Sequence, residues 1–200
     1  MIRVAQAREQ REAREERDLP DMAQLSPALT VPQSTPTCAG STELIQRWLP
    51  ACDGLVNRLE RGAVCVAQAC AGGGATVKMA RAFPRSEFIG LESSTESAQA
   101  ARARAHLDGT RNVRFVVADA QTLTEGEFDC VAFLQEDRAE AASPLALRRV
   151  RDQLNSDGYL LWVASQSSAE DTRRLIEVEG FSRCRVAWAS PRNVIIEARP

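Results

Sequence analysis

From residue 63 to its end, the chain alternates between short apolar runs typical of β-strands and longer segments with helical spacing. Continuous apolar strands separated by helices are typical of a mostly parallel sheet that is covered on both faces, because parallel strands need long crossover connections. A short turn joins the last two expected strands, so at least one of them is antiparallel. The predicted fold class is therefore an α/β three-layer sandwich. We expect helices over residues 75–82, 95–107, 144–154 and 169–178, and strands over 63–69, 87–91, 113–117, 128–134, 159–163, 183–188 and 193–198.

The first 40 residues differ in composition from the rest of the chain. Arginine alternates with Asp and Glu over residues 3–18, and four prolines follow with Ser and Thr between them. This composition provides no apolar face for packing, so we expect residues 1–40 to be a charged, proline-rich and disordered tail. A short helix that binds a partner is the alternative. Ser41 is a suitable helix N-cap, and one folded domain is expected over residues 41–200.

Residue types that commonly perform acid–base and metal chemistry are scarce. The sequence contains one histidine (His106), one tyrosine (Tyr159) and one lysine (Lys78), which excludes a site with several histidine ligands. Its 25 basic and 27 acidic residues give a formal charge of −2, whereas nucleic-acid-binding domains usually carry a basic excess. The six cysteines form no C-x-x-C pair, so no metal site is expected.

Targeting and membrane signals are also missing from the pattern. No apolar run approaches the roughly 18–20 residues that a helix needs to cross a bilayer, and the N-terminus lacks the apolar region of a secretory signal. Cys65 and Cys130 lie within apolar runs, where a free thiol behaves as a small hydrophobic group. We therefore expect a reduced, cytoplasmic protein with neither a membrane nor a nucleic acid as its partner.

Three consecutive glycines follow the first predicted strand. Gly72, Gly73 and Gly74 lie where the chain turns from that strand into the next helix. Glycine permits positive φ and lets a ligand lie against the main chain. Ligands of open parallel sheets bind beyond the carboxyl ends of the strands, beside such turns. The triplet therefore predicts a ligand-binding turn, and a tight strand-to-helix turn without a ligand is the alternative.

Acidic residues stand at the ends of the next two predicted strands. Glu92 follows Gly74 by 18 residues, and a carboxylate there can accept hydrogen bonds from both hydroxyls of a ribose. Asp119 ends the following strand, where a carboxylate can accept a hydrogen bond from the amino group of an adenine. Both residues have a structural alternative as caps of the following helix or turn. The spacing of Glu92 also fits a nicotinamide dinucleotide.

Together these positions resemble the class I S-adenosylmethionine-dependent methyltransferases, which have a Rossmann-like fold. The resemblance runs from about residue 48 to residue 200 and includes the glycine turn, Glu92, and Asp119 with Ala120. It implies a seven-stranded, mostly parallel sheet of order 3-2-1-4-5-7-6 with an antiparallel last strand. It also implies S-adenosylmethionine as the cofactor, with residues 72–74 along its methionine and ribose, Glu92 on the ribose, and Asp119 and Ala120 at the adenine.

More narrowly, the chain resembles the cofactor domain of bacterial methyltransferases that carry a winged-helix domain ahead of it. The segments that carry this resemblance are Trp48-Leu49-Pro50 and the terminal Glu197-Ala198-Arg199-Pro200. Relatives of this kind have a long helical cap over the substrate, where this sequence has only the helix expected over residues 169–178. The resemblance thus implies that the winged helix and the substrate cap are missing here.

Several positions depart from the pattern of the family. Gln68 stands where the resemblance implies an acidic residue at the methionine end of the cofactor, and Cys70 replaces the first glycine of the loop. We include both among the expected cofactor-binding residues. The related enzymes have a His-Asp pair facing the substrate, and the corresponding stretch here contains Glu136, Asp137 and Arg138. These three are the candidates for catalysis and substrate contact.

The resulting hypothesis is a methyltransferase that transfers a methyl group from S-adenosylmethionine to an unidentified small molecule. Methyl transfer is an in-line displacement in which positioning supplies much of the rate, so the scarcity of His, Tyr and Lys is compatible with it. The alternative is a degenerate cofactor-binding or interaction module without turnover, which Gln68, Cys70 and the missing cap favour. An NAD(P)-dependent oxidoreductase is a minor alternative. A homo-oligomer in which another subunit completes the acceptor side is compatible with the sequence.

Overall fold

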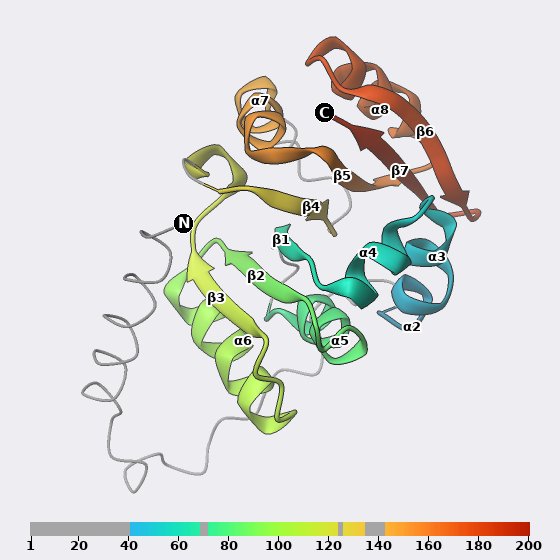
Figure 1. Cartoon of the computed structure of the whole chain (residues 1–200). Helices are drawn as coiled ribbons and strands as arrows, with labels where there is room; N and C mark the ends of the chain where they lie inside the picture. The colour runs from blue at the N-terminus through green and yellow to red at the C-terminus, as the bar shows by residue number, and fades with distance from the viewer. Residues whose placement is uncertain (1–40, 69–71, 124–125, 135–142) are drawn as a thin grey trace, which may run out of the picture. The chain divides into compact units, whose positions relative to one another are not determined.

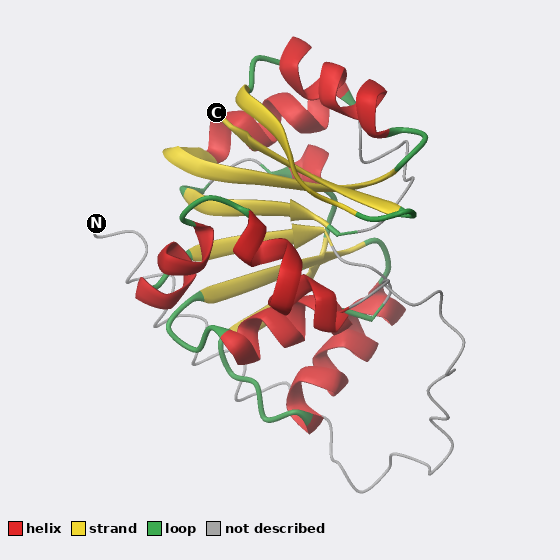
Figure 2. Ribbon diagram, turned by 90° about the vertical axis from the view of Figure 1, so that its right-hand side faces the viewer, coloured by secondary structure: helices red, strands yellow, loops and turns green. Residues whose placement is uncertain are grey.

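The computed structural model describes residues 41–68, 72–123, 126–134 and 143–200, which form a seven-stranded sheet with helices packed against it (Figures 1 and 2). The strand order is β3-β2-β1-β4-β5-β7-β6. Neighbouring strands are parallel except that β7 is antiparallel to both β5 and β6. The predicted fold class and strand order are confirmed. The expected tail, residues 1–40, lies outside the described residues.

The observed elements follow the predicted alternation closely. One difference concerns β5, which begins at Leu154 because this residue pairs with Phe128 in β4 ahead of a register shift. The strands are β1 (Val64–Gln68), β2 (Glu87–Glu92), β3 (Val113–Val117), β4 (Phe128–Phe133), β5 (Leu154–Ser165), β6 (Ser182–Ala189) and β7 (Asn193–Arg199). The helices are α2 (Ser41–Glu43), the π-helical η2 (Leu44–Trp48), α3 (Leu49–Ala51), α4 (Leu55–Arg61), α5 (Gly74–Ala82), α6 (Thr95–Leu107), the 3-10 helix η3 (Ala120–Thr122), α7 (Pro144–Gln153) and α8 (Ala169–Val178).

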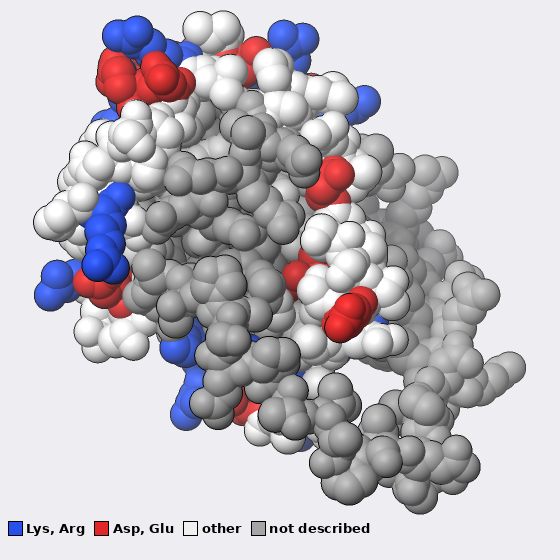
Figure 3. Space-filling view, turned by 180° about the vertical axis from the view of Figure 1, so that it is seen from behind, with Lys and Arg blue, Asp and Glu red and all other residues white. Residues whose placement is uncertain are grey.

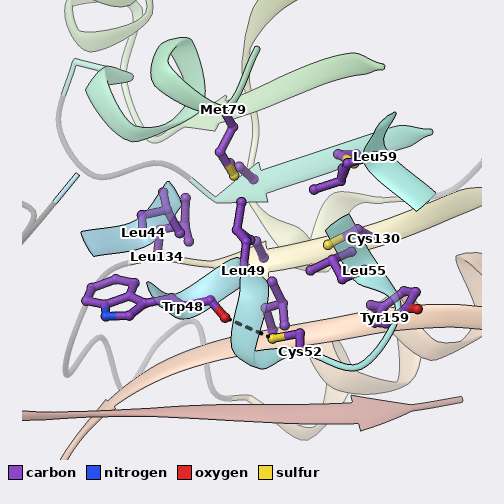
Figure 4. Packing of buried hydrophobic residues seen from close by; sticks show 14 of the residues in the cluster. Leu44, Trp48, Leu49, Cys52, Leu55, Leu59, Met79, Cys130, Leu134 and Tyr159 are labelled. Carbon is purple, nitrogen blue, oxygen red and sulfur yellow. Dashed lines mark hydrogen bonds between the residues drawn. The ribbon is translucent and has the colours of Figure 1, made fainter. Parts of the chain in front are cut away.

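Two large hydrophobic cores lie on opposite faces of the sheet, because successive side chains of a strand point to opposite faces. On one face, the segments from α2 to α5 bury Leu49, Leu55 and Met79 against β1, β4 and β5 (Figure 4). On the other face, α7 and α8 bury Leu147 and Ile176. A third, smaller cluster joins α5, α6 and β3 and consists of Val77, Ala101, Ala105 and Phe115. The sheet is thus the middle layer of the predicted sandwich.

The buried cysteines are packing residues. Cys65 in β1 and Cys130 in β4 are register partners, and Cys52 lies in the same core. Burial raises the pKa of the Cys52 thiol, and a hydrogen bond with Cys65 together with burial raises the pKa of Cys130. Thiols with raised pKa values stay protonated and unreactive at neutral pH. Among the residues described, no cluster of three or more His, Cys, Asp or Glu side chains is suited to hold a metal ion.

The surface of the described part is mixed in charge. Basic and acidic side chains lie interspersed on the face that Figure 3 shows, as the nearly balanced composition predicts. Over the described ranges, no helix combines the length and the apolar character needed to span a membrane.

A buried carboxylate in β7 connects the first helices to the end of the chain. Glu197 is 3% exposed, and its Oε2 accepts hydrogen bonds from Arg185 at 2.6 Å and from the backbone N–H of Asp53 at 3.3 Å. Arg199 donates to the carbonyl oxygen of Asp53 at 3.0 Å and lies 3.4 Å over the ring of Tyr159. The Tyr159 hydroxyl donates to the same carbonyl at 2.9 Å. The terminal Glu-Ala-Arg segment singled out in the sequence therefore has a structural role.

A second polar cluster holds the amino-terminal ends of the central strands. The carboxylate of Asp129 accepts hydrogen bonds from the Val64 N–H at 2.8 Å, Arg58 Nε at 3.0 Å and Asn155 Nδ2 at 2.9 Å. Burial opposes ionisation of this group, but the three donors together hold the pKa of Asp129 below its ordinary value. Arg58 also binds the more exposed Asp157 at 2.6 Å. One ionised carboxylate thus ties β1, β4, β5 and α4 together.

Replacing Asp129 by Asn should lower the free energy of unfolding by roughly 2–4 kcal/mol near pH 7, because the change leaves Arg58 without its inner carboxylate. The folded-state pKa of Asp129 lies below the unfolded value of about 3.9, so its contribution is fully present above about pH 5 and is lost as the pH falls through the folded-state pKa. The difference between wild type and variant should therefore shrink below about pH 4. Urea unfolding over a pH series measures it.

The matched control is Asp157→Asn, since Asp157 binds the same arginine but its side chain is 65% exposed. An exposed ion pair contributes at most about 1 kcal/mol, so this control should change stability little. A loss in Asp129→Asn that stays constant down to about pH 3 would contradict the assignment.

Candidate functional site

The carboxyl ends of the parallel strands meet at one edge of the sheet. β1 ends at Gln68 and β2 at Glu92, and the register pairs Gln68 with Leu91 in β2 and with Phe133 in β4. The strand order reverses here, because β2 lies on one side of β1 and β4 on the other. Open α/β sheets bind their ligands at such a switch point. The structure thus brings Gln68, Glu92 and the glycine turn to one edge, and their roles in binding stay predictions.

The turn after β1 needs glycine for conformational reasons. Gly72 and Gly73 have φ values of +81° and +65°, in the left-handed region that side chains disfavour. Gly73 is the N-cap of α5, and its carbonyl oxygen accepts a hydrogen bond from the Val77 N–H at 2.9 Å. The chain therefore reverses sharply from β1 into α5.

Close packing requires glycine at one position of the triplet but not at the position before it. A Cβ on Gly73 would lie 2.5 Å from Cε1 of Phe115 and 2.8 Å from the Cβ of Ala101. A Cβ on Gly90 in β2 would lie 2.3 Å from the same Phe115 ring. In contrast, a Cβ on Gly72, which is itself buried, would have one heavy atom of the described residues within 4 Å, Nη2 of Arg104 at 3.7 Å. Packing against the described residues therefore accounts for the glycine at 73, whereas a side chain at 72 would clash with none of them.

Glu92 is a buried acid at the site. It is the last residue of β2 and 2% exposed. Its side chain lies on the same face of the sheet as Phe88 and Gly90, because residues two apart in a strand share a face. A carboxylate can accept several hydrogen bonds, and the two hydroxyls of a ribose are donors suited to it. The position fits the predicted role of Glu92.

Some of the buried polar atoms that lack a hydrogen-bond partner in the described part of the chain lie at the same edge, while Thr110 Oγ1, ahead of β3, lies at the opposite end of the strands. Within the described residues, Gln68 Oε1, Thr76 Oγ1 and Asn193 Oδ1 are buried and have no hydrogen-bond partner. Gln68 ends β1, Thr76 lies in the first turn of α5, and Asn193 begins β7 opposite the end of β5. Most buried polar groups in proteins are satisfied, so such atoms point to a ligand. An amide oxygen such as Gln68 Oε1 is an acceptor suited to an ammonium group.

Asp119 has the structural role that was its alternative. It is the N-cap of η3, and its Oδ1 accepts hydrogen bonds from the backbone N–H groups of Gln121 at 2.8 Å and Thr122 at 3.1 Å. Its second carboxylate oxygen takes part in neither bond. Ala120 is 1% exposed and packs into the core beneath β3 and β4. The capping bonds leave the predicted contact of Asp119 with an adenine as a prediction.

Some predicted site residues lie outside the described part of the chain. Cys70 is one of them, and so are Glu136, Asp137 and Arg138. His106 is described, and it is exposed on α6.

One charged residue at the turn was missed by the sequence reasoning. Arg104 lies on α6, and a Cβ on Gly74 would lie 2.6 Å from its Nη1. No local pattern marks this residue, because its contact with the turn depends on how α6 packs beside α5. A guanidinium at this turn adds positive charge to a candidate site otherwise made of acceptors.

A single helix follows β5 before the chain returns to the sheet. Between the end of β5 at Ser165 and the start of β6 at Ser182 there is one helix, α8. Its Ile176 is buried against the sheet, while Glu170, Arg173 and Arg174 form ion pairs along its outer side. The expectation of a single helix in this interval is thus confirmed.

Comparison with known proteins identifies the domain. A family model described as "Methyltransferase domain" matches residues 60–184. These residues include β1, the glycine turn, Glu92 and Asp119, which are the parts of the sheet edge described above. No curated protein sequence matches the chain.

Solved structures share the fold at low sequence identity. A S-adenosylmethionine-dependent methyltransferase from Aquifex aeolicus has a TM-score of 0.65 and 12% identity, covering 80% of this chain and 88% of the other. A precorrin-6y C5,15-methyltransferase from Geobacter metallireducens has a TM-score of 0.58 and 17% identity, covering 68% and 79%. The [4+2]-cyclase SpnF has a TM-score of 0.59 and 16% identity, covering 70% and 75%. These likenesses bear on the fold.

The two glycines with positive φ should respond differently to alanine. Each replacement costs about 1–2 kcal/mol for the left-handed backbone, but Gly73→Ala also drives its Cβ into Phe115 and Ala101. Gly73→Ala should therefore lose roughly 3 kcal/mol or more in total, against roughly 1–2 kcal/mol for Gly72→Ala. Urea unfolding of both variants tests this difference, and equal losses would contradict the packing assignment.

Proposed function

Because the chain belongs to the class I S-adenosylmethionine-dependent methyltransferases, we propose that it transfers a methyl group from S-adenosylmethionine to a small molecule. The observation that carries this proposal is the buried Glu92 beside the glycine turn at the switch point of the sheet. A buried acid next to a side-chain-free turn is suited to a nucleoside, whose hydroxyls bind the carboxylate while its body lies on the backbone.

Each part of the edge would hold a different part of the cofactor. Glu92 would accept hydrogen bonds from the ribose hydroxyls, and residues 72–74 would lie along the ribose and the methionine. Gln68 would accept a hydrogen bond from the ammonium group through Oε1, which has no partner within the described chain. Asp119 and Ala120 would border the adenine. The Gln68 Oε1, which has no partner among the described residues, and the lack of side chains at residues 72–74 support the fit of this group.

Methyl transfer requires little acid–base catalysis from the protein. When bound, S-adenosylmethionine supplies a methyl group on a positively charged sulfur that a nucleophile can attack directly. Around it, the chain's own residues orient the reactants, and holding two reactants in line can supply much of the rate. This demand matches a sequence with one His, one Tyr and one Lys. Glu136, Asp137 and Arg138 stay the candidates for contact with the acceptor.

A small-molecule acceptor is favoured over a nucleic acid by charge. The formal charge is −2, and basic and acidic side chains are interspersed on the face in Figure 3, whereas nucleic-acid substrates call for a basic surface. We also propose a reducing, cytoplasmic setting, which the free thiols of Cys52, Cys65 and Cys130 support.

The second candidate is a module that binds the cofactor without turnover. Two features favour it: Gln68 stands where the resemblance implies an acid, and the single helix α8 stands where the resemblance implies a cap. An amide keeps a hydrogen bond to the ammonium group but loses the charge, and charge-assisted hydrogen bonds are about twice as strong. The fold alone does not fix the reaction, since SpnF, described as a [4+2]-cyclase, shares it.

Glu92→Gln should weaken binding of S-adenosylhomocysteine by roughly tenfold to a hundredfold, because the ribose hydroxyls lose a charged acceptor. Isothermal titration calorimetry on the full chain measures the affinity. The matched control is Glu87→Gln at the exposed start of the same strand, which should bind like the wild type. Unchanged affinity in Glu92→Gln would remove Glu92 from the site, and no binding by the wild type at millimolar ligand would overturn the proposed function.

Gln68→Glu should strengthen binding of S-adenosylmethionine by roughly threefold to tenfold, because the restored carboxylate would pair with the ammonium group. The same titration measures this change, and Gln68→Leu, which removes the acceptor oxygen, should weaken binding. If Gln68→Glu binds no better than the wild type, Gln68 does not contact the ammonium group.

A further inference from the structure

Arg104 lies over the glycine turn without a counter-ion in the described chain. Its Nη1 is 2.6 Å from the position of a Cβ on Gly74, and its Nη2 is 3.7 Å from that of a Cβ on Gly72. Arg104 is exposed, and among the described residues no carboxylate lies within ion-pair distance of it, in contrast to Arg58 and Arg185, which pair with carboxylates. A guanidinium that lies against a glycine backbone at a candidate binding turn is positioned to bind an anion.

The start of α5 adds positive potential at the same place. Its N-cap, Gly73, offers no side-chain cap, and its first turn contains no acidic residue. The unsatisfied N–H groups and the helix dipole therefore lack an anionic partner within the described protein. Helix N-termini with this arrangement bind carboxylates and phosphates.

A buried hydroxyl in the same turn points independently to a ligand. Thr76 is fully buried, and its Oγ1 has no hydrogen-bond partner among the described residues. Cα–Cβ bonds in a helix tilt toward its N-terminus, so the Thr76 hydroxyl is directed to the glycine end of α5. A buried hydroxyl left unsatisfied in the free protein is a typical partner for a bound polar group.

We propose that Arg104 is a ligand-binding residue that holds the carboxylate of the cofactor's amino-acid end against the first turn of α5. This inference rests on the proposed function, since the carboxylate is the one anionic group of S-adenosylmethionine. Arg104 and Gln68 then bind the two oppositely charged groups of the cofactor's amino-acid end. The guanidinium binds the carboxylate, and the amide oxygen at the end of β1 binds the ammonium group.

Two ligands that differ only in the carboxylate test the proposal. Titration calorimetry on the full chain would use S-adenosylhomocysteine and its decarboxylated analogue. Arg104→Gln should weaken S-adenosylhomocysteine about tenfold or more, the loss expected for a charge-assisted hydrogen bond, and should leave the decarboxylated analogue unchanged. Arg104→Lys, which keeps the charge without the planar fork, should lie between wild type and Arg104→Gln.

The control is Arg111→Gln, which makes the same charge change at an exposed position two residues before β3, at the opposite edge of the sheet. It should bind both ligands like the wild type. Equal weakening of both ligands by Arg104→Gln, no change, or tighter binding would each overturn the role of Arg104 while leaving the proposed function in place. Failure of the wild type to bind S-adenosylhomocysteine would overturn the proposed function and this inference with it.

Discussion

The contact of the Phe115 ring with the bare backbones of Gly73 and Gly90 links the core of the sheet to the turn where the cofactor is expected. The ring occupies the space that a side chain on either glycine would need, so β2, β3 and the start of α5 approach one another closely. The turn is therefore held in shape from within the protein. A binding site that is already in place loses less entropy when its ligand arrives.

The division into strands and helices could be predicted from the sequence because apolar periodicity and glycine punctuation are local signals. Leu154 shows where such signals fail, since its helical spacing hides a pairing with Phe128 that only the folded sheet provides. Glu92 and Gln68 could be placed at the ends of strands, but the burial of Glu92 could not be predicted. Arg104 gave no signal, because its position over the turn depends on the packing of α6. The sequence could not distinguish adenine binding from capping for Asp119, because both roles require an acid at this position. The structure shows the capping hydrogen bonds.

The candidate site combines acceptors and a cation with few titrating catalysts. Glu92 and Gln68 offer oxygen atoms, and Arg104 and the start of α5 offer positive charge. Such an edge is complementary to a ligand that carries hydroxyls, an ammonium group and a carboxylate. Methyl transfer from that ligand would then depend on how the methyl acceptor is positioned. The segments that follow β4 and β5 are the candidates for this positioning.

The network around Glu197 has a consequence for the order in which the domain is completed during folding. Asp53 lies just ahead of α4, while its partners Glu197 and Arg199 belong to the last strand. β7 also separates β5 from β6, so the sheet is complete only when β7 has paired with both strands. Contacts this distant in sequence form late, because the entropy of closing the long loop must be lost first. Until β7 (Asn193–Arg199) has paired, the apolar edge of β5 lacks its partner strand, so this stage of folding is the one most exposed to edge-to-edge aggregation.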